Sequence, residues 1–134
     1  MSLVLPKELQ FNWESACQDI VNAIKWHLEN TNANRGVIGL SGGLDSSVTA
    51  TLAVKALGKD NLHGFILPEK GVTPEEDIED ALRLAKYLEI RDKLIEISPV
   101  VGAVTKQVPE LLERDSKGGL RRPLAYGNIK ARVR

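Results

Sequence analysis

Apolar residues recur at helical spacing near the start of the chain and in short unbroken runs further on. Residues 13–29 predict an amphipathic helix, with Asn12 available as its N-cap. The apolar positions of this helix are Trp13, Cys17, Ile20, Ile24 and Leu28. Three later runs, at residues 37–40, 63–67 and 93–97, have the length of buried strands. The chain is therefore expected to begin with a helix and to continue with short strands.

Helices are predicted between these strands. Residues 46–57 directly follow the first strand, and Gly58 stands where a left-handed C-terminal cap is expected. The residues expected on the buried face of this helix are Val48, Leu52, Ala53 and Ala56. The next helix is expected to start at Thr73, with Pro74 at the first position and Glu76 completing a capping box. Its expected buried face is formed by Ile78, Ala81, Leu82, Ala85 and Leu88.

The order of the elements predicts the fold class. After the first helix, strands and helices alternate, and a short helix follows the third strand at Ser98-Pro99. Such alternation predicts a parallel sheet with right-handed connections and helices on both faces. We therefore expect an α/β, doubly wound sheet, belonging to one domain over residues 1–134. Three strands are few for such a sheet, so we expect it to be truncated after the third strand.

Charge and composition argue against binding to nucleic acid or membranes and against export. The 134 residues include 18 basic and 18 acidic side chains, so no overall positive field favours nucleic acid. A single cysteine cannot form an internal disulfide, and no apolar run reaches the roughly 18 to 20 residues that span a bilayer. Pro6, Lys7 and Glu8 interrupt the place where a signal peptide needs apolar residues. We expect a cytoplasmic protein that binds neither nucleic acid nor membranes.

A glycine-rich string stands where the first strand turns directly into a helix. The string reads Gly39-Leu40-Ser41-Gly42-Gly43-Leu44-Asp45-Ser46. Backbone N–H groups and the positive end of a helix dipole converge at such a turn and favour an anion such as phosphate. Ser41 and Ser46 offer hydroxyl donors, and Asp45 offers a hard oxygen ligand for Mg²⁺. No lysine follows as in a Walker A loop, and a bare glycine pair would predict only a tight turn.

The motif Ser-Gly-Gly-Leu-Asp-Ser resembles the pyrophosphate loop of the N-type ATP pyrophosphatases, which cleave ATP between its α- and β-phosphates. The resemblance implies a Rossmann-like fold of the adenine nucleotide alpha hydrolase type, with ATP as co-substrate and Mg²⁺ bound by Asp45. It also implies that backbone atoms near Leu67, after the second strand, contact adenine. The ATP-binding residues implied in this way are Gly39, Leu40, Ser41, Gly42, Gly43, Leu44, Asp45, Ser46 and Leu67.

The end of the chain narrows the resemblance to one family. Gly127-Asn128-Ile129-Lys130-Ala131-Arg132-Val133-Arg134 resembles the G-N-x-K-A-R-x-R segment of ammonia-dependent NAD synthetases, although its cations alone would indicate only a solvated face. The stretch Val54-Lys55-Ala56-Leu57-Gly58 agrees with that family. The resemblance implies that Asn128 and Arg132 bind deamido-NAD, with Arg132 contacting the substrate.

The activity that this family implies is an ATP-dependent amidation. Deamido-NAD is converted to NAD through an adenylated intermediate, ammonia is the nitrogen donor, and AMP and pyrophosphate are released. No residue of the protein is expected to act as a nucleophile, and a homodimer is expected by analogy. Because the family continues well past Arg134, the chain as given is expected to bind nucleotide weakly and to be inactive by itself.

Two other functions remain open, namely a tRNA-modifying N-type ATP pyrophosphatase and a non-catalytic nucleotide-binding module. A tRNA-modifying enzyme would need a cysteine pair or a basic extension, and neither is found in the sequence. Cys17 is expected to be a buried structural thiol, and neither His27 nor His63 is assigned a role. The acidic residues at the start of the third helix are expected to serve its dipole rather than a metal ion. They are Glu75, Glu76, Asp77, Glu79 and Asp80.

Overall fold

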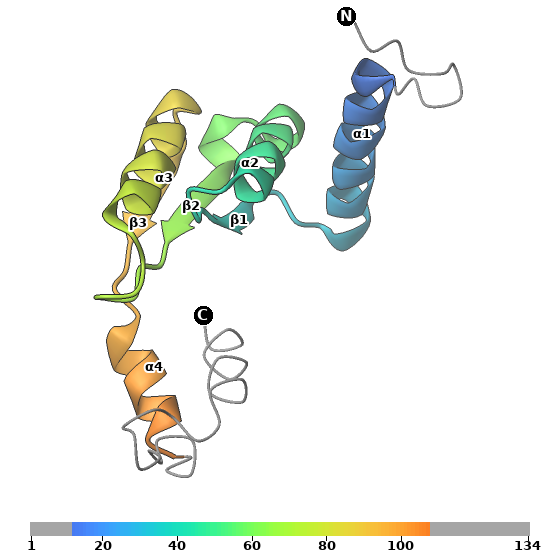
Figure 1. Cartoon of the computed structure of the whole chain (residues 1–134). Helices are drawn as coiled ribbons and strands as arrows, with labels where there is room; N and C mark the ends of the chain where they lie inside the picture. Colours follow the sequence, from blue (N-terminus) through green and yellow to red (C-terminus); the bar gives the residue numbers. More distant parts are fainter. Residues whose placement is uncertain (1–11, 108–134) are drawn as a thin grey trace, which may run out of the picture.

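A parallel sheet forms the centre of the computed structural model, which describes residues 12–107 (Figure 1). Its strands, β1 (Gly36–Gly39), β2 (Leu62–Ile66) and β3 (Arg91–Leu94), lie in the order β1-β2-β3. Both neighbouring pairs run parallel, as the alternation of strands and helices predicts. The helices are α1 (Trp13–Thr31), α2 (Leu44–Leu57), α3 (Glu75–Tyr87) and α4 (Ser98–Thr105), with a 3-10 turn, η2 (Lys59–Asn61), after α2. The predicted α/β class is confirmed.

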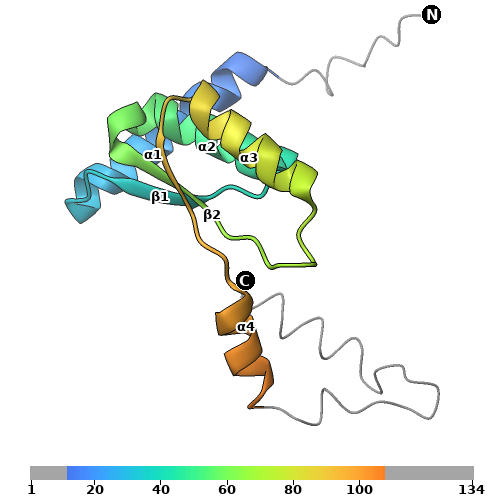
Figure 2. The same cartoon turned by 90° about the vertical axis from the view of Figure 1, so that its left-hand side faces the viewer.

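Both crossover helices cover the same face of the sheet (Figures 1 and 2). The core contains alanines of α2 and α3 together with larger apolar residues of the sheet face below them. Its buried members are Leu40, Ala50, Ala53, Leu62, Ile66, Ala81, Ala85 and Ile90. Helices on both faces were expected, but the described strands follow one another in a single direction, which places successive crossovers on one side.

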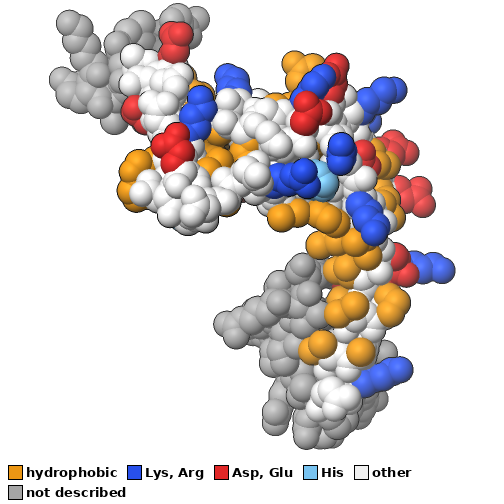
Figure 3. All heavy atoms as spheres, turned by 180° about the vertical axis from the view of Figure 1, so that it is seen from behind, with side chains coloured by type: hydrophobic (Ala, Val, Ile, Leu, Met, Phe, Trp, Pro, Cys, Tyr) orange, Lys and Arg blue, Asp and Glu red, His pale blue; other side chains and the backbone are white. Residues whose placement is uncertain are grey.

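The opposite face of the sheet carries alternate residues of the same strands. In register across this face lie Val37 of β1, His63 of β2 and Arg91 of β3. Val37 is 73% exposed and Arg91 is also exposed, whereas His63 on the central strand is half-buried. Figure 3, which views the molecule of Figure 1 from behind, shows basic and apolar side chains side by side. The described residues therefore cover one face of the sheet and leave the other largely open.

The first helix begins as predicted and turns most of the predicted stripe inward. The Asn12 side chain accepts a hydrogen bond from Ser15 N at 3.0 Å, which confirms the N-cap. Val21 is the buried residue of α1, whereas Trp13 and Ile20 are exposed. Cys17, Ile24 and Leu28 are half-buried on the same side as Val21, so the predicted face is confirmed at these positions and wrong at Trp13 and Ile20.

Three predicted features of the other helices are also corrected. Val48 was expected to be buried but is 49% exposed. The prediction is wrong because small and apolar residues occur on more than one side of α2, so its sequence does not mark the buried face clearly. The capping box at Thr73 is absent: α3 starts at Glu75, and the Thr73 hydroxyl instead accepts the N–H of Glu69 at 2.9 Å. Gly58 follows α2 with a positive φ of 82°, but its ψ of 153° is not that of a left-handed helix.

The strands also begin earlier than predicted, by one residue for β1 and β2 and by two for β3. The early start of β3 reflects its edge position, where exposed polar residues replace an apolar run. Within residues 12–107, no helix is both long and apolar enough to cross a bilayer.

We predict that Leu62→Ala lowers the free energy of unfolding by about 2 to 4 kcal/mol, because it leaves a cavity under both crossover helices. Leu62 is 2% exposed and is the largest fully buried side chain described. Leu44→Ala is a matched control with the same atoms removed from a side chain that is 78% exposed, and it should change stability by less than about 0.5 kcal/mol. Urea unfolding followed by circular dichroism measures both, and equal losses would contradict the core assignment.

Candidate functional site

The glycine loop joins β1 directly to α2, as predicted. Gly43 is the N-cap residue of α2 and has an extended backbone. Because glycine has no side chain, it makes no capping hydrogen bond to the first turn of the helix. The first turn of a helix has N–H groups without intrahelical partners, and here no capping side chain takes them. Asp45 is the acidic residue of this first turn. The loop therefore presents unfilled donors and the positive end of a helix dipole.

Two serine hydroxyls hold the loop in this shape. Ser41 Oγ and Ser46 Oγ lie 3.0 Å apart, and Ser46 Oγ donates to Gly43 O at 3.0 Å. The N–H of Gly43 donates to Ser41 Oγ, and the N–H of Ser41 donates to Ser46 Oγ, both at 3.3 Å. The hydroxyl protons are thus used inside the loop, so either serine must rotate its O–H outward before it donates to a phosphate.

Gly42 is required where the loop meets the next helix. It has a positive φ of 78°, which glycine adopts without strain. A Cβ at this position would lie 2.4 Å from the backbone oxygen of Asp77 in the first turn of α3. The loop after β1 is therefore packed directly against the backbone of α3.

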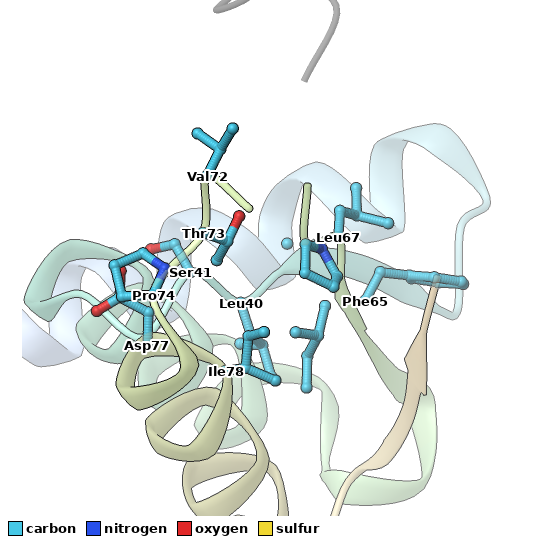
Figure 4. A pocket seen from close by; sticks show the side chains of 12 residues that line it. Leu40, Ser41, Phe65, Leu67, Val72, Thr73, Pro74, Asp77 and Ile78 are labelled. Carbon is cyan, nitrogen blue, oxygen red and sulfur yellow. The ribbon is translucent and has the colours of Figure 1, made fainter. Parts of the chain in front are cut away.

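A cavity of about 390 Å³ opens at the carboxyl ends of β1 and β2 (Figure 4). Ligands of open parallel sheets bind at this edge, outside the ends of the strands. The lining is mostly apolar, and its polar side chains are Ser41, Thr73 and Asp77. The apolar lining residues are Leu40, Phe65, Ile66, Leu67, Pro68, Val72, Pro74 and Ile78, and Gly39 completes the wall. An apolar cavity that ends at an anion-binding loop has the two halves of a nucleotide site.

The segment after β2 forms one wall of this cavity as a closed turn. Glu69 O accepts the N–H groups of both Val72 and Thr73, at 3.1 and 2.9 Å, while Glu69 N donates to the Thr73 hydroxyl. Gly71, at the tip, has a positive φ of 75°. These bonds close residues 69–73 into a compact turn.

The residues present fit a magnesium ion held jointly with phosphate. Asp45 is exposed, and its carboxylate makes no hydrogen bond or ion pair with another described residue. No three His, Cys, Asp or Glu side chains gather around a common point in residues 12–107. Mg²⁺ commonly takes one or two carboxylates and completes its shell with phosphate oxygens and water. A single carboxylate beside a phosphate loop is consistent with that mode of binding.

The predicted site residues divide into three groups. Gly39, Leu40, Ser41 and Leu67 line the cavity. The residues from Gly42 to Ser46 do not line the cavity but continue from Ser41 into the start of α2. Asn128 and Arg132 lie outside the described residues.

The prediction missed the contribution of the third helix. Asp77 lines the cavity, although the acids of this helix start were expected only to serve the dipole. Thr73 and Val72 were also missed as lining residues. The signal in the sequence was the position of this helix start, directly after the second strand and thus at the same edge of the sheet as the glycine loop.

Comparison with known proteins identifies the family. The family model described as NAD synthase matches residues 16–134. The chain belongs to the NAD synthase family. Among curated relatives, the NH(3)-dependent NAD(+) synthetase of Hyperthermus butylicus is 40% identical over 121 residues, and that of Methanosarcina mazei is 42% identical over 121 residues. Each match covers 90% of this chain and 44% of the relative, so the chain spans less than half the length of these family members.

Solved structures of the family share the fold. The NH3-dependent NAD synthetase from Campylobacter jejuni has a TM-score of 0.73 and 31% identity, covering 92% of this chain and 49% of that one. The NMN synthetase from Francisella tularensis has a TM-score of 0.74 and 32% identity, covering 92% and 47%. The Rossmann-like parallel sheet expected for the chain is confirmed by these neighbours.

We predict that Gly42→Ala lowers the free energy of unfolding by about 3 kcal/mol, because a positive φ and a backbone clash both oppose the methyl group. Gly71→Ala is the matched control: its φ is also positive, but nothing lies within 4 Å of the added Cβ. It should cost about 1 to 2 kcal/mol. Thermal unfolding of both variants separates the clash from the strain, and equal destabilisation would show that the contact with Asp77 is unimportant.

Proposed function

We propose that the chain supplies the ATP site of an enzyme that amidates deamido-NAD to NAD with ammonia. The observation that carries the proposal is the cavity at the strand ends, whose wall includes Ser41 of the glycine loop that leads into the uncapped start of α2. Membership of the NAD synthase family supports the product, and the names of the relatives support ammonia as the donor.

The proposed reaction has two steps. The nicotinate carboxylate attacks the α-phosphorus of ATP, forming an acyl adenylate and releasing pyrophosphate. Ammonia then attacks the activated carbonyl carbon, AMP leaves, and the nitrogen loses a proton to give the amide. Neither step uses a nucleophile from the protein, so the chain acts by positioning the phosphates and stabilising charge.

The described residues have distinct parts in this proposal. Adenine lies in the apolar section of the cavity near Leu67, and the phosphates lie against the N–H groups that Gly43 leaves uncapped. Pyrophosphate gains charge as it departs, and Mg²⁺ on Asp45 stabilises that charge when bound. Ser41 and Ser46 first organise the loop and then donate to phosphate.

The remaining partners extend the proposal beyond the described residues. Asn128 and Arg132 bind deamido-NAD, where the planar guanidinium suits a phosphate or carboxylate. The enzyme works as a homodimer. Because family members are more than twice as long as the matched part, residues 1–134 bind ATP weakly and need the remaining sequence for turnover.

A fusion protein that supplies the remaining sequence tests whether residues 1–134 have the proposed function. Residues 1–134 are joined to the part of the Methanosarcina mazei relative that follows the match and incubated with ATP, deamido-NAD and ammonium. Formation of NAD, AMP and pyrophosphate in equal amounts is expected. Since one similar structure is an NMN synthetase, nicotinic acid mononucleotide is offered as a competing substrate. A folded fusion that prefers the mononucleotide, or that consumes ATP only with tRNA, would refute the proposal.

We predict that Asp45→Asn weakens binding of Mg²⁺-ATP at least about tenfold and leaves the fold intact, because it removes an anionic ligand at constant size. Binding of ATP without magnesium should change much less. Calorimetric titration of the fusion protein with and without magnesium measures the difference. Asp60→Asn, an acid in η2 away from the cavity, is the control. An unchanged magnesium dependence would overturn the metal assignment.

A further inference from the structure

The wall of the cavity formed by residues 69–73 is tied to the start of α4. Lys70 N donates to Ser98 Oγ at 2.8 Å, and Ile97 N donates to Pro68 O at 3.0 Å. The turn is closed by its own hydrogen bonds. Its position relative to the glycine loop depends on how it is anchored at residues 97 and 98.

The Ser98 hydroxyl is itself held in orientation. Ser98 N donates to Glu96 Oε1 at 2.7 Å, and the Ser98 side chain also bonds to Glu96. These two bonds, with a smaller effect from Lys70, hold the pKa of the Glu96 carboxyl below its ordinary value. Ser98 thus links the two segments, because its N–H donates to the Glu96 carboxylate while its Oγ accepts the Lys70 N–H.

The hydrogen bond between Lys70 and Ser98 connects the turn after β2 to helix α4. Helix α4 projects away from the body of the protein (Figures 1 and 2), and it meets the wall of the cavity at its first residue. Ile95 N adds a further bond, to Ile66 O at the end of β2. The orientation of α4 and the position of the wall are therefore set by the same few bonds.

We infer that Ser98 is a positioning residue for ATP, which holds the turn after β2 against the nucleotide and links it to α4. The inference rests on the proposed function of the cavity. Ser98 is not among the residues that line the cavity. It affects the cavity only by accepting the Lys70 N–H and so holding the turn after β2 in place. Loss of its hydroxyl frees one anchor of the wall and leaves the glycine loop unchanged.

The test compares three variants of the fusion protein that joins residues 1–134 to the remaining part of the Methanosarcina mazei relative. Ser98→Ala removes the acceptor, Ser98→Thr retains it, and Thr105→Val removes a buried hydroxyl from the same helix away from the cavity. Affinity for Mg²⁺-ATP is measured by calorimetry, amide exchange is measured over residues 69–73, and thermal unfolding gives stability. Ser98→Cys, whose sulfur is a weak acceptor, replaces Ser98→Ala if that variant does not fold.

Ser98→Ala is expected to weaken Mg²⁺-ATP binding about fivefold, as loss of one net hydrogen bond implies, and to speed exchange of the Lys70 amide. Ser98→Thr and Thr105→Val should keep both properties. A merely structural role would lower the melting temperature in Ser98→Ala and Thr105→Val alike without a selective loss of ATP affinity, and that result overturns the inference. Failure of the unmodified fusion protein to bind ATP overturns the proposed function as well, whereas ATP binding that is unaffected by Ser98→Ala overturns the inference alone.

Discussion

The close approach of two helices to one face of the sheet is the constraint on which the site depends. Ala50, Ala81 and Ala85 are fully buried between the helices and the strands. Gly64 lets Leu40 lie across β2, since an added Cβ would be 2.9 Å from Leu40 Cδ1. Larger side chains at these positions would push α2 and α3 outward. Their starts would then separate, and the cavity between glycine loop and α3 would lose its shape.

Much of this arrangement was predictable because its signals are local. The Asn12 cap, the strand that turns into a helix and the parallel order are each encoded within a few residues, and all are confirmed. The buried face of α2 was predicted only in part: Leu52 and Ala53 are buried as expected, but Val48 is exposed, because the small and apolar residues of this helix are not confined to one side. The role of Thr73 was missed because a threonine before a helix can cap it or close a preceding turn, and here it does the second.

The site illustrates the same division. The glycine loop was predicted from its sequence motif. The turn after β2 and Asp77 also line the cavity, but they have no distinctive motif. Their part follows from topology, because the carboxyl ends of neighbouring parallel strands meet at one edge. The internal bonds of Ser41 and Ser46 show a loop that is already shaped before a ligand arrives. Such preorganisation lowers the entropy lost when phosphate binds.

The contact between Gly42 and Asp77 has a consequence for how the family can evolve. The atom that excludes a side chain at position 42 is a main-chain oxygen, which every amino acid at position 77 carries in the same place. No exchange of the neighbouring side chain can make room, so a replacement of Gly42 has no single compensating partner there. Searches for second-site suppressors of such a replacement should find changes that shift the whole of α3, and none at position 77.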